Sequence, residues 1–104
     1  MLKINYEFRK GIFFIRFLGV MNEKNCSLKN NEIKDLILRN QFKYIVINTN
    51  YLKKIDLNSL NYIIDICYLM EKNTCNLVIC DKTHLFEKLT NKRIPNIIDE
   101  LEVL

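Results

Sequence analysis

The sequence predicts an α/β fold in which a short mixed β-sheet packs against helices. Short apolar runs typical of strands alternate with longer segments whose apolar residues recur at helical spacing. Two strand-like runs joined by a tight turn open the chain, which adds an antiparallel hairpin. The 104 residues, 49% hydrophobic with only two glycines and one proline, suit a single folded domain spanning residues 1–104.

The opening hairpin follows from two runs of different pattern. Residues 2–8 alternate apolar and polar, the period of a half-buried strand. Arg9, Lys10 and Gly11 predict a turn, and residues 12–18 form a second, mostly apolar strand. Such a short connection favours antiparallel pairing of the two strands.

The first helix is expected after a loop over residues 19–26, which are polar and irregular. Ser27 is the candidate N-cap, because its hydroxyl can accept a bond from an early unpaired amide. The apolar stripe has a spacing of three and four residues and ends near residue 40. Its members are Ile33, Leu36, Ile37 and Asn40.

A buried central strand and a second helix are expected next. Residues 44–48 are a short, nearly continuous apolar run, and residues 48–55 are expected to form a loop. The second helix begins around Asn58 and Ser59 and ends at residues 71–73. Its buried stripe comprises Leu60, Ile63, Ile64 and Cys67.

The last third of the chain supplies another buried strand at residues 77–80. A short helix with Leu85, Phe86 and Leu89 follows, and Pro95 ends it. Residues 97–104 are expected to form either an edge strand or a short terminal helix. Because strands alternate with helices, right-handed crossovers and a largely parallel sheet follow.

Charge and hydropathy disfavour nucleic-acid and membrane partners. The net charge of +4 is mild, and acidic residues are interleaved with basic ones rather than separated from them. No stretch approaches the ~20 apolar residues of a membrane span. The first residues lack the basic-then-apolar order of a signal peptide, so a cytoplasmic protein is expected.

Neither a metal site nor a cofactor is expected from the sequence. The cysteines form no C-x-x-C pair, and His84 is not spaced as a zinc partner. Reduced, structural thiols are the simpler interpretation, with Cys67 and Cys80 placed as small core residues. The four cysteines are Cys26, Cys67, Cys75 and Cys80.

An enzymatic role is disfavoured on similar grounds. His84, Asp81 and Asp56 are the titratable candidates at strand ends, where open α/β sheets bind ligands. The sequence has no glycine-rich phosphate loop, nucleophile elbow or paired-carboxylate motif to accompany them. We therefore expect no enzyme.

One local motif resembles a known family. After an apolar strand and a loop, residues 56–60 read Asp-Leu-Asn-Ser-Leu at the start of the second helix. STAS domains, including bacterial anti-sigma-factor antagonists, carry Asp-Ser-Ser/Thr-Gly-Leu at this place, so Asp56 and Leu60 match. The order of elements resembles the family along nearly the whole chain. The resemblance implies a STAS-like short mixed sheet with an N-terminal antiparallel hairpin and helices packed mainly on one side.

The departures from the motif bear on regulation. In phosphorylated family members a Ser or Thr stands where this chain has Asn58, and an amide cannot take a phosphoryl group. Ser59, at the family's glycine position, is therefore a candidate phosphorylation site. The alternative is local: Asn58 caps the helix by accepting amide bonds, and Asp56 or Ser59 assists.

The resemblance implies a non-enzymatic module for signalling or transcription regulation that binds a protein through the start of the second helix. The implied partner is an anti-sigma factor with a kinase-like fold or another STAS protein, and a homodimer is a further expectation. The alternative is a scaffold subunit of a larger STAS-containing assembly. Tyr62 and Tyr68 either anchor an interface or only flank the core. The expected binding residues are Asp56, Asn58, Ser59, Tyr51, Lys53, Lys54, Asn61, Tyr62 and Asp65.

Overall fold

The computed structural model describes residues 1–73, 75–82, 96–97 and 99–103. The expected helix with Leu85, Phe86 and Leu89, its end at Pro95, and His84 lie outside the described residues. The elements are β1 (Leu2–Arg9), β2 (Ile12–Met21), α1 (Glu23–Asn40), β3 (Tyr44–Ile55), α2 (Leu57–Lys72), β4 (Asn76–Cys80), β5 (Asn96–Ile97) and the 3-10 helix η1 (Glu100–Glu102).

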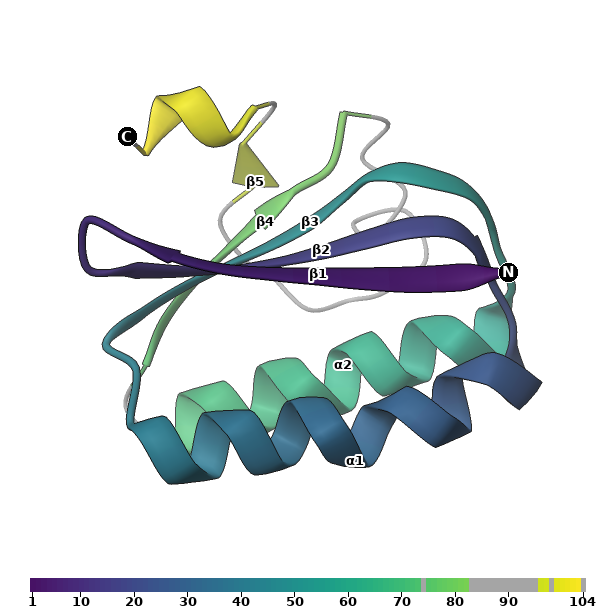
Figure 1. Cartoon of the computed structure of the whole chain (residues 1–104), viewed down its shortest axis with the longest axis horizontal. Coiled ribbons are helices and arrows are strands. Elements are labelled where there is room, and N and C mark those ends of the chain that lie inside the picture. Colours follow the sequence, from purple (N-terminus) through teal and green to yellow (C-terminus); the bar gives the residue numbers. More distant parts are fainter. Residues whose placement is uncertain (74, 83–95, 98, 104) are drawn as a thin grey trace.

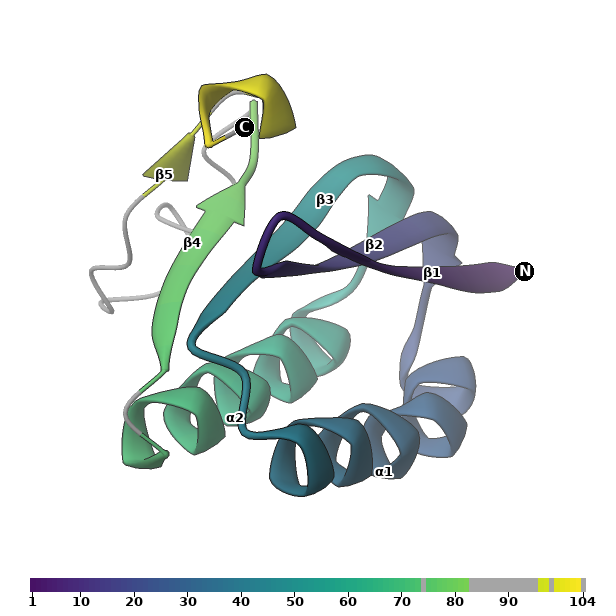
Figure 2. The same cartoon turned by 60° about the vertical axis from the view of Figure 1, so that its left-hand side comes forward.

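The described strands form one sheet in the order β1-β2-β3-β4-β5. β1 is antiparallel to β2, whereas β2, β3, β4 and β5 are mutually parallel. Both α1 and α2 lie on one face of this sheet, side by side (Figures 1 and 2). The mixed sheet with an opening hairpin and helices on one side is therefore confirmed. Among the described residues of the expected segment 97–104, Ile97 belongs to the two-residue strand β5 and Glu100–Glu102 form a 3-10 helix, so both expected forms occur.

The hairpin turn is built from two left-handed residues. Lys10 has φ of 52° and Gly11 has φ of 80°, as a two-residue type I′ turn requires. Arg9 pairs with Ile12 directly across this turn, and the register then continues without a bulge to Leu2 and Gly19. The turn type thus fixes the register of the whole hairpin.

The main core lies between the sheet and the two helices, because alternate strand residues point to opposite faces. Phe13, Ile15 and Phe17 of β2 face the helices and are buried there with Ile63 and Cys67 of α2. The opposite face of the sheet carries a smaller apolar cluster. Its buried members are Phe14, Val46 and Cys80, with Ile97 and Val103 packed against them.

The expected loop over residues 19–26 is wrong, because β2 continues to Met21 and α1 begins at Glu23. Asn22, not Ser27, is the N-cap of α1, and Ser27 lies within the helix. The Asn25 amide donates to Asn22 Oδ1 and the Asn22 amide donates to Asn25 Oδ1, both at 3.0 Å. This reciprocal pair satisfies two backbone amides and starts the helix a turn earlier than Ser27 would.

The expected loop over residues 48–55 is also wrong, because this segment continues β3. Its pairing with β2 shifts register twice, between Arg16 and Leu18 and between Gly19 and Val20. Each shift places an additional β3 residue opposite β2, which breaks the alternation expected of a strand. The sequence pattern of this segment is irregular for that reason.

Cys26, Cys67 and Cys80 are buried, which confirms the expected core positions of Cys67 and Cys80. None of the four cysteines forms a disulfide, and within the described ranges no group of His, Cys, Asp and Glu has the arrangement of a metal site. Neither described α-helix is both long enough and apolar enough to cross a membrane.

Candidate partner-binding site at the start of α2

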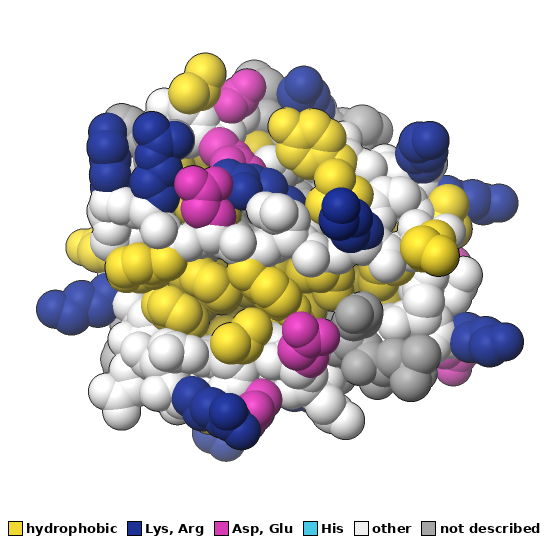
Figure 3. Space-filling view, viewed as in Figure 1, with side chains coloured by type: hydrophobic (Ala, Val, Ile, Leu, Met, Phe, Trp, Pro, Cys, Tyr) yellow, Lys and Arg dark blue, Asp and Glu magenta, His cyan; other side chains and the backbone are white. Residues whose placement is uncertain are grey.

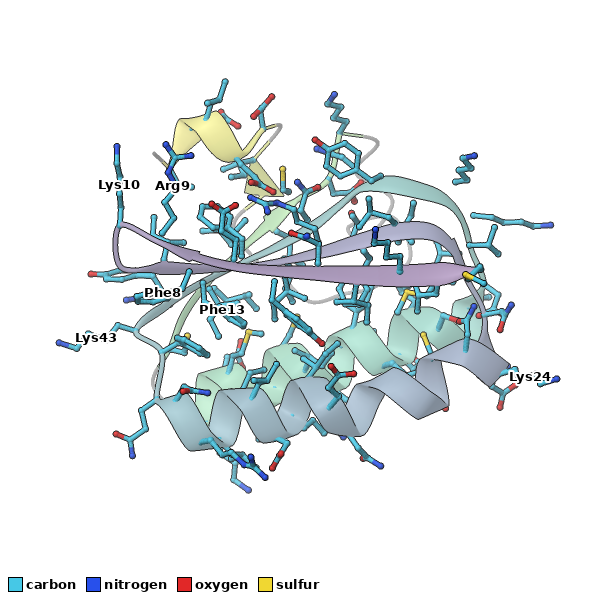
Figure 4. The ribbon with its side chains drawn as sticks, in the orientation of Figure 1. Phe8, Arg9, Lys10, Phe13, Lys24 and Lys43 are labelled. Atoms are coloured by element: carbon cyan, nitrogen blue, oxygen red, sulfur yellow. The ribbon has the colours of Figure 1, made fainter. Side chains whose placement is uncertain are left out.

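The starts of α1 and α2 are brought together by the sheet. Met21 and Ile55 are paired at the ends of β2 and β3. β2 leads directly into α1, and β3 leads directly into α2. The amide of Asp56 donates to the Met21 carbonyl at 3.4 Å. Both helices therefore begin at the same end of the molecule, where Lys24 also lies (Figures 1 and 4).

Asp56 is the N-cap of α2. Its Oδ1 accepts a hydrogen bond from the Ser59 amide at 2.8 Å, and its backbone is extended, as capping requires. The hydroxyl and then the amide of Ser59 lower the pKa of the Asp56 carboxyl below its usual 3.8. The carboxylate thus remains charged at neutral pH beside the positive end of the helix dipole.

Asn58 has a different role from the expected cap. Its Nδ2 donates to Glu23 Oε2 of α1 at 3.1 Å, so the expectation that Asn58 caps α2 is wrong. The reason is its position, two residues after the cap, where its side chain points away from the free amides and toward the neighbouring helix. Asn58 is exposed and links the two helix starts.

Ser59 is completely buried, with 0% of its surface exposed. Its hydroxyl faces the Asp56 carboxylate and the Cys26 thiol without reaching the geometry of a regular hydrogen bond. A kinase reaches this oxygen only if the first turn of α2 opens. Phosphorylation of Ser59 stays a prediction that requires such an opening.

The solvent-facing side of α2 carries Asn58, Asn61 and Asp65, which recur at helical spacing and are exposed. Tyr62 is half-buried and packs against the main core, so it flanks the core as one alternative expected. Tyr68, in contrast, is 56% exposed.

The remaining predicted residues fall on two different faces. Lys53 and Lys54 are exposed and line a cleft of about 410 Å³ above Leu60 of α2. Tyr51 lies instead beside Arg16, on the face of the sheet opposite α1 and α2. Lys53 and Lys54 therefore lie near the start of α2, whereas Tyr51 lies on another face of the molecule.

Leu57 is the site residue that the sequence pattern missed. It follows the Asp56 cap directly and is 65% exposed, although it is a large apolar residue. Its position in the first turn was the available signal, because that turn has no preceding turn to cover it. We define the α2-start surface as Asp56, Leu57, Asn58, Asn61 and Asp65, with Lys53 and Lys54 at its border.

A second polar cluster, also missed by the sequence, lies on the face of the sheet opposite α1 and α2. Glu100 accepts from Arg16 Nε at 2.8 Å and from Arg16 Nη2 at 2.7 Å. Asn48 Nδ2 donates to the same carboxylate, and Arg16 also pairs with Glu7 at 2.8 Å. The hydrogen bond from Arg16 is the main cause that lowers the pKa of Glu100. These contacts fasten η1 over the sheet.

No protein-family model and no curated protein matches this sequence. Solved structures do match. SpoIIAA, an anti-sigma-factor antagonist solved in its unphosphorylated form, is 12% identical with a TM-score of 0.79, over 99% of this chain and 93% of SpoIIAA. An anti-sigma-factor antagonist from Mycobacterium paratuberculosis is 12% identical with a TM-score of 0.78, over 98% and 90% of the two chains. Phosphorylated Bacillus SpoIIAA is 14% identical with a TM-score of 0.71, over 97% and 96%. The chain therefore has the STAS-like fold of anti-sigma-factor antagonists.

Proposed function

We propose that this chain is a non-enzymatic regulatory module that binds a protein partner through the α2-start surface. The observation that carries the proposal is Leu57, an apolar side chain 65% exposed between the charged cap Asp56 and the polar Asn58. An exposed apolar residue framed by polar groups has the composition of a small protein interface. Lys53 and Lys54 add charge at its border.

The start of α2 is also held rigid before any partner arrives. The Asp56 cap fixes the first turn, and the contact between Asn58 and Glu23 ties that turn to α1. A surface that is already ordered loses less conformational entropy on binding than a loop does. This favours recognition by the helix start over recognition by a flexible segment.

The fold and Asn58 together support a regulator without the usual phosphorylation switch. SpoIIAA has been solved both with and without phosphate. A phosphate would add almost two negative charges to the helix start, whereas Asn58 presents a neutral amide there. The partner suggested by the resemblance is an anti-sigma factor with a kinase-like fold or another STAS protein.

We also propose that this module has no catalytic activity. Asp56 is engaged as a helix cap, whereas Asp81 is buried at the end of β4, with only 4% of its surface exposed. Asp81 lines the cleft beside Lys53 and Lys54, and Asp56 is not among the described residues that line it. A binding role accounts for the exposed residues of α2 without requiring acid–base chemistry.

The test compares two single substitutions that add the same charge at different places. Asn58→Glu adds a carboxylate at the α2-start surface, and Asn31→Glu adds one on an exposed position of α1. The wild type and both variants are used to capture partners from a lysate of the source cell, and bound proteins are quantified by mass spectrometry. We expect Asn58→Glu to lose a regulator that the wild type and Asn31→Glu retain. Recovery of the same proteins by all three would exclude this surface.

A scaffold subunit is the second candidate function. The observation that favours it is the edge strand β1, which is paired with β2 on one side and has no described element on the other. Self-association through such an edge would fit an assembly role. Solution mass distinguishes the two candidates, since a scaffold forms large assemblies.

A further inference from the structure

Within the described residues, the outer edge of β1 pairs with no other strand, and the hairpin turn determines which of its backbone groups point outward. In a two-residue turn the closing pair, here Arg9 and Ile12, exchanges backbone hydrogen bonds, and every second pair does so thereafter. The odd-numbered residues of β1 therefore bond to β2, in agreement with the bond from the Val20 amide to the Met1 carbonyl. The N–H and C=O groups of even-numbered residues point outward. These residues are Leu2, Ile4, Tyr6 and Phe8.

In the part of the chain that the structure describes, this edge has no proline, no bulge and no covering segment, three features that protect edge strands. β1 is eight residues long, contains no proline and pairs with β2 without a bulge. No described segment lies in front of it in Figure 1. Long, regular edges of this kind are templates for pairing with another strand.

An apolar band runs along the same side of the molecule, directly below the edge and above α1 (Figure 3). Ile4 and Tyr6 of β1 and Leu36 of α1 are only half-buried where they pack against the core. Phe8, beside the hairpin turn in Figure 4, is 62% exposed, and its ring lies 5.7 Å from that of Phe42. A strand added at this edge would bring apolar side chains over the band.

The sequence of β1 is complementary to itself when two copies run antiparallel. In the register centred on Asn5, the outward-bonding pairs are Leu2 with the partner's Phe8 and Ile4 with the partner's Tyr6. On the other face of the sheet, Lys3 lies opposite the partner's Glu7, and two-fold symmetry repeats this pair. In this register, therefore, opposite charges face one another on one side of the sheet and apolar residues face one another on the other side.

Neighbouring registers do not place Lys3 opposite the partner's Glu7. Centring the pair on Tyr6 sets Lys3 against the partner's Arg9, which is a like-charge contact. Centring it on Ile4 leaves Glu7 opposite the partner's Met1 and removes the charge pair. A register that pairs even-numbered with odd-numbered residues would place outward-pointing N–H and C=O groups opposite groups that already bond to β2. Charge and hydrogen bonding therefore select the register centred on Asn5.

We propose that two copies of this chain pair through β1 in that register, which joins their sheets into one continuous sheet. The proposal is independent of the partner-binding role, because α2 lies beneath β3 and β4, away from the β1 edge (Figure 2). The α2-start surface stays exposed in this dimer. Each dimer therefore presents two such surfaces.

Sedimentation velocity over a range of protein concentrations tests the pairing. The wild type is expected to form a dimer of twice the 12.5 kDa chain mass. Lys3→Glu places two carboxylates opposite one another at both symmetric positions, and we expect its dimer dissociation constant to rise about tenfold or more. Lys72→Glu, at the end of α2, is the matched control and is expected to leave the constant unchanged.

A charge exchange tests the register itself. Glu7→Lys alone is expected to weaken the dimer as Lys3→Glu does, whereas a mixture of the two single variants restores opposite charges in a mixed pair. A mixed dimer from two weakly associating variants supports the register, and its absence contradicts it. Glu7 also contacts Arg16, so circular dichroism must first show that Glu7→Lys is folded. If it is not folded, Lys3→Glu and amide exchange decide the question.

Amide hydrogen exchange measured by NMR locates the interface. The amides of Ile4 and Tyr6 are expected to be protected in the wild-type dimer and to exchange rapidly in the Lys3→Glu monomer. The amide of Asn5 bonds to β2 and is expected to stay protected in both. A wild type that is monomeric at every concentration, or a dimer in which Ile4 and Tyr6 exchange freely, would overturn the proposal.

Discussion

Arg16 of β2 holds the carboxylate of Glu100 through two hydrogen bonds, from Nε at 2.8 Å and from Nη2 at 2.7 Å, across 84 positions of sequence. Such a bidentate arginine–carboxylate pair is stronger than a hydrogen bond between two neutral groups. It fastens η1 against the face of the sheet opposite α1 and α2, where Val103 packs against the cluster that contains Phe14. The relationship makes Glu100 a structural residue of the fold.

Replacing this carboxylate is expected to destabilise the protein. Glu100→Gln removes one charged acceptor of Arg16 and should lower the free energy of unfolding by about 1–2 kcal/mol. Asp35→Asn is the control, because the pair of Asp35 and Arg39 is exposed and should contribute less than ~0.5 kcal/mol. Urea unfolding of both variants measures the difference. Equal effects of the two substitutions would show that the Glu100 contact adds nothing beyond a surface pair.

The Glu100 contribution should depend on pH in a defined direction. The pKa of Glu100 is lowered in the folded state, chiefly by the hydrogen bond from Arg16, from the usual 4.5. Its stabilisation is therefore complete above the unfolded pKa and is lost as the pH falls through the lower, folded pKa. The difference in unfolding free energy between the wild type and Glu100→Gln should shrink below about pH 4.5. A difference that is constant between pH 7 and pH 3 would contradict this.

The two glycines provide a matched pair for testing backbone strain. Both have positive φ, +80° at Gly11 and +94° at Gly19, so alanine is strained at each. A Cβ at Gly11 meets nothing within 4 Å, whereas one at Gly19 would lie 2.3 Å from the Met1 carbonyl oxygen. Gly11→Ala should cost about 1 kcal/mol of unfolding free energy, and Gly19→Ala about 2 kcal/mol or more. The reverse order in thermal or urea unfolding would disprove the close approach of Met1.

Thiol reactivity should separate Cys75 from the other cysteines. Cys26, Cys67 and Cys80 are buried and Cys75 is half-buried, and burial raises the pKa of the Cys80 thiol to about 11. In the native protein a disulfide reagent should modify one thiol of the four quickly, and Cys75→Ser should abolish that fast phase. All four should react once the chain is unfolded. Two or more fast thiols in the native protein would show that the core opens.

Much of the fold could be predicted because burial imposes local periodicity. The alternation in residues 2–8 and the helical spacing of Leu60, Ile63 and Cys67 record which side of each element faces the core. The motif at Asp56 likewise located the start of α2 and the candidate site. In that site the sequence identified the exposed Asn58, Asn61 and Asp65, although it assigned the cap to the wrong side chain.

The order of the elements and three members of the buried stripe of α2, Leu60, Ile63 and Cys67, could be predicted because they depend on residues close together in the chain. The fourth predicted member, Ile64, is only half-buried, whereas Ile66 and Met70 are buried. Features that depend on contacts between residues far apart in the sequence could be seen only in the tertiary structure. Residues 48–55 are a strand only because β2 pairs with them through two register shifts. Asn58 meets Glu23, and Arg16 meets Glu100, because the sheet brings separate segments together. No local sequence pattern predicts those contacts, because they form and stabilise the protein only after distant segments have folded together.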